Sequence, residues 1–388
     1  MQGRDGQREK YIRKVCDKTG LDRETVAAEM DYAYEHGISY WTYCYKGYWF
    51  IPHDKLVHAH YHGARRRRIA RELAKIRGRR PIEIEREIIY ARYKLGLRVG
   101  FFRKYDWDLL TEEQREQMLL RPYSAQMSRK YRTKDANPNF LNKKHRFYRA
   151  FPEYIGRKWM RYDPEMTLEE FTKAIADFKT SDIIYKPEDS SGGSGIRKFS
   201  LAGGPEKLYG QLKEENCDPA LLEECLEQHP DMARLCDESI NTIRAVCLYW
   251  EGEYHLLYTV CRMGAGKGKP VDNVSQGGLA ISVDPETGRF NTVAADHDGN
   301  PQTVHPASGV ELIGYQVPYW DEVLELVKTA AIRTYELAGL GYTGWDIAIT
   351  PDGPVIIEGN NWPSPSLIQL CNWLDSRKGM KYLFEPYL

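Results

Sequence analysis

The stretch that decides the fold reads GWDIAIT (344–350), PDG (351–353) and PVIIEGNN (354–361). Two apolar, β-branched runs flank a turn sequence, a pattern typical of a β-hairpin. With the turn centred on Asp352, Asp346 lies opposite Glu358, and Asn360 shares the face of Glu358 because side chains alternate along a strand. Two carboxylates and an amide oxygen suit a hard cation, so we expect these three residues to bind Mg²⁺. A solvated hairpin with scattered polar residues is the alternative.

Basic residues are concentrated in one part of the chain. The formal net charge is +0, yet residues 61–160 contain 27 Lys and Arg against 11 Asp and Glu. Such a segment indicates an anionic partner, which could be a nucleotide, a sugar phosphate, a nucleic acid or a membrane surface. A pair of solvated basic helices would have the same composition.

The eight cysteines form no C-x-x-C pair, and several lie in apolar, strand-like runs. This pattern is typical of reduced, buried thiols and favours a cytoplasmic protein over a disulfide scaffold. No run of about 18 apolar residues occurs, so we expect no transmembrane segment. The N-terminus also lacks the apolar stretch of a secretory signal.

The chain is expected to have two parts. Residues 1–134 are predicted to be mainly helical and basic, with helices over 65–76 and 82–95 and an aromatic hairpin over 39–51. From residue 135 to 388, apolar strands alternate with Gly-rich loops and helices, which indicates a mixed α+β domain. The clearest helix signal there covers 320–338 and ends at Gly339.

A strand that ends in a lysine precedes a loop rich in glycine and serine. The strand is IIYKP (183–187), and the loop is EDSSGGSG (188–195). Backbone N–H groups of such a loop can turn toward phosphate oxygens, and Lys186 can reach the same oxygens. A flexible connector would look similar. The spacing of a P-loop and the Rossmann fingerprint are both absent, which excludes these two nucleotide sites.

The order of these features resembles the ATP-grasp superfamily. It comprises the lysine and its loop, an acidic segment after an apolar run, the NTIR motif (241–244) and the closing Asp…Glu-x-Asn. The segments SINTIR (239–244), RMG (262–264) and DNVSQGG (272–278) resemble most the sugar-transfer-associated branch. The resemblance covers residues 135 to about 370. It implies an ATP-grasp fold, in which two α+β subdomains hold ATP.

The resemblance also implies roles for individual residues, although it leaves open whether Lys143 or Lys144 contacts phosphate. Without the surrounding pattern, Arg244 and Arg262 would be taken for members of ordinary ion pairs. The implied residues are Lys144, Lys186, Ser191, Gly192, Gly193, Ser194, Glu223, Glu224 and Leu226 for ATP, Arg244, Arg262 and Asn273 for catalysis, and Asp346, Glu358 and Asn360 for one or two Mg²⁺ ions.

In function, the resemblance implies an ATP-dependent ligase that joins a small-molecule carboxylate to an amine of a small molecule, a peptide or a carrier-linked group. The carboxylate would attack the γ-phosphorus, and the amine would displace phosphate from the resulting acyl phosphate. A phosphotransferase on the same fold is the main alternative. A nucleic-acid or anion-binding module built on RRRR (65–68) is less favoured. Residues 1–134 would shape an acceptor or partner site.

Overall fold

The structure is a computed structural model, and it describes residues 9, 12–13, 16, 22–24, 26–27, 56–188, 195–266, 274 and 277–388, without the side chains of 56–64 and 93–94. The predicted aromatic hairpin over 39–51 lies outside these residues. The chain forms two compact units, Met1–Thr111 and Glu112–Leu388. Residues 112–134, which precede the predicted boundary, thus belong to the second unit.

The first unit is helical where the structure describes its residues, as predicted. Gly78 adopts a φ of +65° between the two main helices, and Pro81 opens the second, where its missing N–H is not needed. A buried ion pair joins these helices, with Arg66 Nε 2.8 Å from a Glu85 oxygen. Burial raises the pKa of Glu85, and Arg66 opposes that shift. The elements are α4 (Leu56–Arg77), α5 (Pro81–Lys94), α6 (Val99–Lys104) and η2 (Trp107–Leu109).

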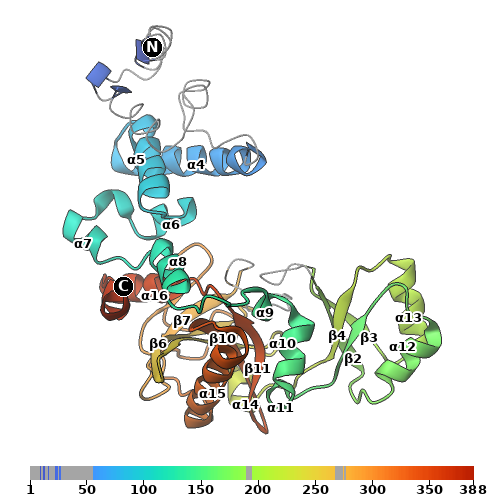
Figure 1. The fold of residues 1–388 in the computed structure, drawn as a ribbon. Coiled ribbons are helices and arrows are strands. Elements are labelled where there is room, and N and C mark those ends of the chain that lie inside the picture. The colour runs from blue at the N-terminus through green and yellow to red at the C-terminus, as the bar shows by residue number, and fades with distance from the viewer. Residues whose placement is uncertain are drawn as a thin grey trace. The chain divides into compact units, whose positions relative to one another are not determined.

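The second unit contains two antiparallel sheets (Figure 1). The smaller has the strand order β1-β4-β2-β3. Two amphipathic helices cover it, and a capping box at Thr167 and Glu170 starts the first of them. Their apolar side chains form a core with the inner face of the sheet. The elements are β1 (Trp159–Tyr162), α12 (Leu168–Ile175), β2 (Asp182–Pro187), β3 (Arg197–Ser200), α13 (Pro205–Glu214) and β4 (Ala220–Glu224).

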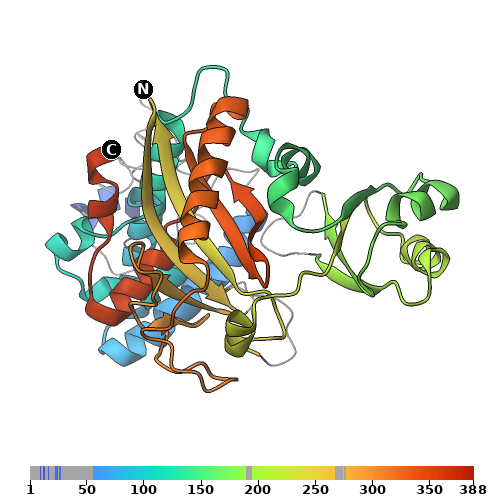
Figure 2. The same ribbon diagram turned by 90° about the horizontal axis from the view of Figure 1, so that it is seen from below.

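The larger sheet has the order β11-β10-β5-β6-β7-β8-β9. Figure 2 shows helix α15 across one face of it and the small sheet to its side. Helix α15 runs from Trp320 to Ala338, as predicted from its apolar periodicity, and Gly339 is its C-cap residue. The other elements are β5 (Thr242–Trp250), β6 (Glu253–Met263), β7 (Leu279–Val283), β8 (Ala294–Ala295), β9 (Pro301–Gln302), β10 (Tyr342–Thr350) and β11 (Gly353–Asn360).

Side-chain alternation divides the larger sheet into an apolar and a polar face. Ile243, Trp345 and Ile347 join the core that α15 covers. Their neighbours Arg244 and Asp346 must therefore point to the opposite face.

Short helices complete the second unit. No helix among the described residues is long and apolar enough to cross a membrane. The remaining elements are α7 (Glu112–Glu116), α8 (Arg121–Lys130), α9 (Asn139–Asn142), α10 (Lys144–Ala150), α11 (Pro152–Ile155), α14 (Pro230–Leu235), α16 (Ser366–Ser376), η4 (Lys381–Leu383) and η5 (Glu385–Tyr387).

Candidate active site

The predicted hairpin is present as β10 and β11, with Asp346 opposite Glu358. Its turn is shorter than a turn centred on Asp352 would be, because Thr350 pairs directly with Gly353. A two-residue turn continued in regular register would not place the two carboxylates opposite each other. The predicted pairing is therefore confirmed, but the turn alone does not produce it.

A β-bulge in β11 restores the register. Ile347 pairs with Ile356, whereas the next residue back along β10, Asp346, pairs with Glu358. Ile357 is the extra residue between these two pairs. In a ladder without the bulge, Ile357 would stand opposite Asp346 and Glu358 would point to the other face. The bulge thus places both carboxylates on the polar face of the sheet.

The two predicted catalytic arginines form ion pairs with Asp346. Arg244 lies directly opposite on β5 and donates through Nε and Nη2 to the two carboxylate oxygens, with Nη2 2.6 Å away. Arg262 Nη2 lies 2.9 Å from the same carboxylate and also bonds the Thr242 hydroxyl. Burial of Asp346 would raise its pKa, but the two guanidinium groups outweigh this and hold the pKa below its usual range.

Glu358 and Asn360 lie beside this cluster. The Glu358 carboxyl is 3.8 Å from Arg244, and partial burial together with the charge of Asp346 raises its pKa to about 6. Asn360 has a buried amide nitrogen with no hydrogen-bond partner in the described part of the chain.

Two mutually repelling carboxylates on one sheet face, with the side-chain oxygen of Asn360 available beside them, fit a hard divalent cation, because such a cation prefers oxygen ligands. The described residues contain no group of three or more His, Cys, Asp or Glu that could hold a metal. A cation here would therefore depend on two acids and the asparagine.

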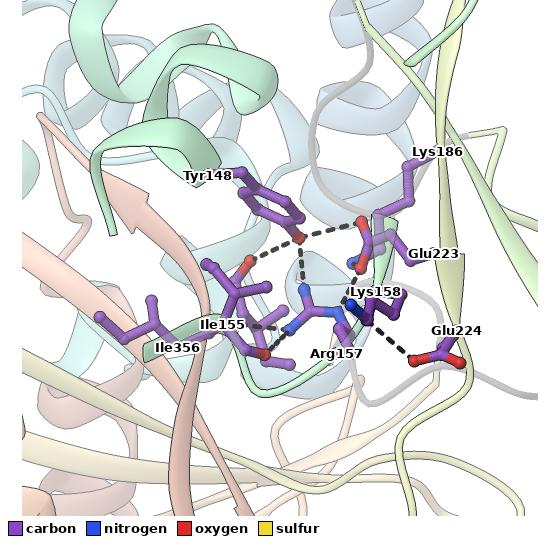
Figure 3. Close-up of polar contacts among 9 residues, drawn as sticks. Tyr148, Ile155, Arg157, Lys158, Lys186, Glu223, Glu224 and Ile356 are labelled. Carbon is purple, nitrogen blue, oxygen red and sulfur yellow. Dashed lines mark hydrogen bonds and ion pairs between the residues drawn. The ribbon is translucent and has the colours of Figure 1, made fainter. Parts of the chain in front are cut away.

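A second charged cluster surrounds Glu223 on β4 (Figure 3). Lys186 Nζ lies 2.9 Å and Arg157 Nε 2.6 Å from one Glu223 oxygen, and the Tyr148 hydroxyl donates to the other at 2.9 Å. Burial would raise the pKa of Glu223, but Arg157 and Lys186 reverse the shift and keep it ionised. The cluster contains two cations and one carboxylate, so an arriving anion would balance its charge.

The two clusters influence each other. Burial lowers the pKa of Lys186, and the charges of Glu223 and Glu358 both oppose that shift. Glu358 also contributes to the raised pKa of Tyr148, after burial as the main cause. The Tyr148 hydroxyl lies 2.9 Å from a Glu223 oxygen and 3.3 Å from the carbonyl of Ile357, the residue before Glu358, so the two clusters are adjacent.

The other predicted ATP ligands differ in position. Lys144 donates from Nζ to the carbonyl of Pro187 at 3.3 Å, so it lies where β2 enters the glycine-rich loop. Glu224 points away from Glu223, and its carboxylate accepts from the backbone N–H groups of Lys158 (2.8 Å) and Lys179.

The contacts described above involve none of the remaining predicted residues. Leu226 follows the end of β4 and is half-buried. Lys143, the alternative to Lys144, is the N-cap residue of α10. Ser191, Gly192, Gly193, Ser194 and Asn273 lie outside the described residues.

Sequence reasoning did not identify Arg157 or Tyr148. Arg157 precedes β1, and its side chain is only 3% exposed. Its guanidinium carbon lies 5.1 Å from the centre of the Tyr148 ring on α10. The sequence Gly156-Arg157-Lys158 before the short strand β1 does not indicate that the arginine is buried. The partner carboxylate is 66 residues further along the chain.

The fold and the polar face together define the ATP-grasp class of protein. A family model described as sugar-transfer associated ATP-grasp matches residues 125–377. The chain therefore belongs to this family, as its motifs indicated. Comparison with curated proteins gives no match.

Several solved structures resemble parts of the chain. D-alanyl-alanine synthetase A from Vibrio cholerae is 11% identical, with a TM-score of 0.39 and coverage of 66% of each chain. Phosphoribosylamine–glycine ligase from Thermotoga maritima is 12% identical, with a TM-score of 0.38, covering 61% of this chain and 51% of that one. An N5-carboxyaminoimidazole ribonucleotide synthetase in complex with ADP is also 12% identical, with a TM-score of 0.36 and coverage of 58% and 46%. The chain thus spans about half the length of the last two structures.

Proposed function

We propose that the protein is an ATP-dependent ligase that joins a carboxylate to an amine through an acyl phosphate. The observation that supports this most is the grouping of Arg244, Arg262, Asp346 and Glu358 on one face of four neighbouring strands. Glu358 acts electrostatically on Lys186, at the entrance to the glycine-rich loop. Membership of the ATP-grasp family agrees with nucleotide binding at this place.

Asp346, Glu358 and Asn360 would hold magnesium, which would neutralise phosphate charge. A metal on Asp346 would compete with the guanidinium groups that this carboxylate now binds. Arg244 and Arg262 would then be available to the γ-phosphate and to the acyl phosphate. Before nucleotide arrives, Asp346 keeps two buried cations neutralised in the place where phosphate charge will enter.

In the proposed reaction, a carboxylate oxygen of the first substrate attacks the γ-phosphorus, and the bond from that phosphorus to the bridging oxygen breaks, releasing ADP. The amine nitrogen then attacks the acyl carbon, inorganic phosphate leaves, and the amine loses a proton. Phosphoryl transfer depends mainly on positioning and on neutralising negative charge. Lys144 and Lys186, together with the two arginines, would supply that positive charge.

The test is the release of ADP and phosphate from ATP, measured with the full chain across pooled amino acids, uronic acids and small peptides. A ligase releases both products only when a carboxylate and an amine are supplied together. ADP release without inorganic phosphate would indicate a phosphotransferase instead. Failure to bind any adenine nucleotide would refute the proposal.

Lys186→Met is expected to weaken ADP binding in the presence of Mg²⁺ by about tenfold or more, because a phosphate loses a charge-assisted contact. The fold should persist, since Glu223 keeps Arg157 and Tyr148 as partners. Isothermal titration calorimetry gives the affinity. Lys198→Met is the matched control, because Lys198 lies on the adjacent strand β3, is 57% exposed and pairs with Asp182. Equal affinity in both variants would contradict the assignment of Lys186.

A further inference from the structure

The Arg157 guanidinium joins the two sheets of the second unit. Through Nε it binds Glu223 on β4 of the small sheet, and through Nη1 it donates to the carbonyl of Ile356 on β11 at 3.2 Å. A further bond from Nη1 to the Ile155 carbonyl at 2.8 Å fixes the side chain near its own backbone. Arg157 is buried, so water cannot replace these bonds cheaply.

Tyr148 makes the same connection from another element. Its hydroxyl lies 2.9 Å from a Glu223 oxygen and 3.3 Å from the carbonyl of Ile357, and it accepts a hydrogen bond from Arg157 Nη2. Figure 3 shows Tyr148 and Arg157 converging on Glu223, with Ile356 on the opposite side of Arg157.

The two contacts on β11 fall at the bulge. Ile357 is the residue without a ladder partner on β10, and Ile356 precedes it. A bulge disrupts the local ladder and leaves polar backbone groups that need other partners. Arg157 and Tyr148 contact the two carbonyls that immediately precede Glu358. The group that orients Glu223 and Lys186 therefore also stabilises the irregularity that puts Glu358 opposite Asp346.

We propose that Arg157 and Tyr148 are positioning residues, which hold the Lys186–Glu223 pair in a fixed relation to the β11 bulge and thereby to Glu358. They touch neither substrate nor metal in this scheme and act through Glu223 and through the backbone of β11. The inference rests on the proposed nucleotide-binding role of Lys186 and Glu223. In this scheme, one hydrogen-bonded unit fixes both the nucleotide-contacting residues on the small sheet and the position of Glu358 on the large sheet.

The first test is a double-mutant cycle on ADP affinity, measured by calorimetry with Mg²⁺ present. Arg157→Lys should weaken binding by about tenfold, because lysine cannot form the forked set of bonds, and Tyr148→Phe by about fivefold. In a Glu223→Gln background, Arg157→Lys should have less than about a twofold further effect, because contacts through one shared group are not additive. An unchanged affinity, or an equal loss in both backgrounds, overturns the proposal.

Arg333→Lys is the matched control. Arg333 also pairs with a glutamate, Glu153, and lies over an aromatic ring, that of Phe151 at 5.3 Å. It contacts neither Glu223 nor β11 in the bonds described. Its replacement should leave ADP affinity unchanged, and thermal unfolding of all variants shows whether they fold. Because Tyr148→Phe conserves shape, it keeps the test valid if Arg157→Lys is unstable.

The second test asks whether nucleotide binding is transmitted to β11. With a chelator in place of Mg²⁺ and saturating ADP, amide hydrogen exchange in the 353–360 segment should slow in the wild type and in Arg333→Lys. It should not slow in Arg157→Lys. Equal slowing in all three proteins overturns the link while leaving the proposed ligase function standing. A wild type that binds no ADP refutes both.

Discussion

Replacing Glu358 by glutamine is expected to reduce ATP turnover by at least about 100-fold, the scale seen when one group that stabilises developing charge is removed. Glutamine keeps the size of the side chain and one oxygen but cannot carry the negative charge that would hold Mg²⁺ opposite Asp346. The ADP-release assay, run with substrates that support turnover in the wild type, gives the rate.

The fold of this variant should persist. Because the pKa of Glu358 is raised to about 6, ionising this group opposes folding as the pH rises from about 4.5 through 6. Glutamine does not ionise, so the free energy of unfolding of the variant should fall less than that of the wild type over this range. Denaturant unfolding at pH 5 and pH 7 measures the difference. Undiminished turnover in a folded Glu358→Gln protein would remove Glu358 from the site.

Much of the second unit could be predicted from local patterns. The apolar periodicity and Gly339 set both ends of helix α15, and the apolar run 242–250 coincides with strand β5. These elements are predictable because burial on a helix or strand imposes a short period on the sequence. The two strands of the final hairpin were predictable for the same reason, since both are clearly apolar.

The bulge at Ile357 was not predictable, because it depends on partners distant in sequence. Arg157 and Tyr148 contact the carbonyls at the bulge, and neither residue stands out in its own segment. The predicted position of Glu358 opposite Asp346 held because an unforeseen short turn and an unforeseen bulge compensate each other by one residue. A strand register inferred from a turn alone can therefore agree with the structure for a different reason.

The sequence alone could have predicted that Glu223 and Glu224 point in opposite directions. Adjacent residues of a strand face opposite sides, so only one of two consecutive acids on β4 can join Lys186. The structure gives that place to Glu223, whereas Glu224 accepts from backbone N–H groups at the ends of neighbouring loops. Family resemblance located the segment, and strand periodicity would have separated its two acids.

Asp346→Ala should lower the free energy of unfolding by about 3–5 kcal/mol, because it leaves two buried guanidinium groups without their shared carboxylate. Urea unfolding followed by tryptophan fluorescence measures the change. Asp352→Ala on the exposed turn of the same hairpin is the control and should change stability by less than about 0.5 kcal/mol. A loss below about 1 kcal/mol at Asp346 would contradict the ion-pair account.

The pH dependence gives an independent check with a definite sign. The pKa of Asp346 lies below its usual value in the folded protein, so its stabilising effect is complete above pH 4 to 5 and disappears as the pH falls further. The difference in unfolding free energy between wild type and Asp346→Ala should therefore shrink as the pH falls below 4. It should also decrease as the pH rises from 5 to 7, because Asp346 opposes the ionisation of Glu358 in the wild type only.

Replacing the whole cluster distinguishes a structural from a functional reason for keeping these charges. Apolar residues of similar volume often match or exceed a buried ion pair in stability, because they avoid its desolvation penalty. Asp346→Leu combined with Arg244→Met and Arg262→Met should therefore recover much of the stability that Asp346→Ala loses, while nucleotide turnover stays abolished. Recovery would show that the cluster is not required for folding and is kept for the phosphate and metal it would bind. Failure to recover would show that the charges themselves specify this part of the sheet.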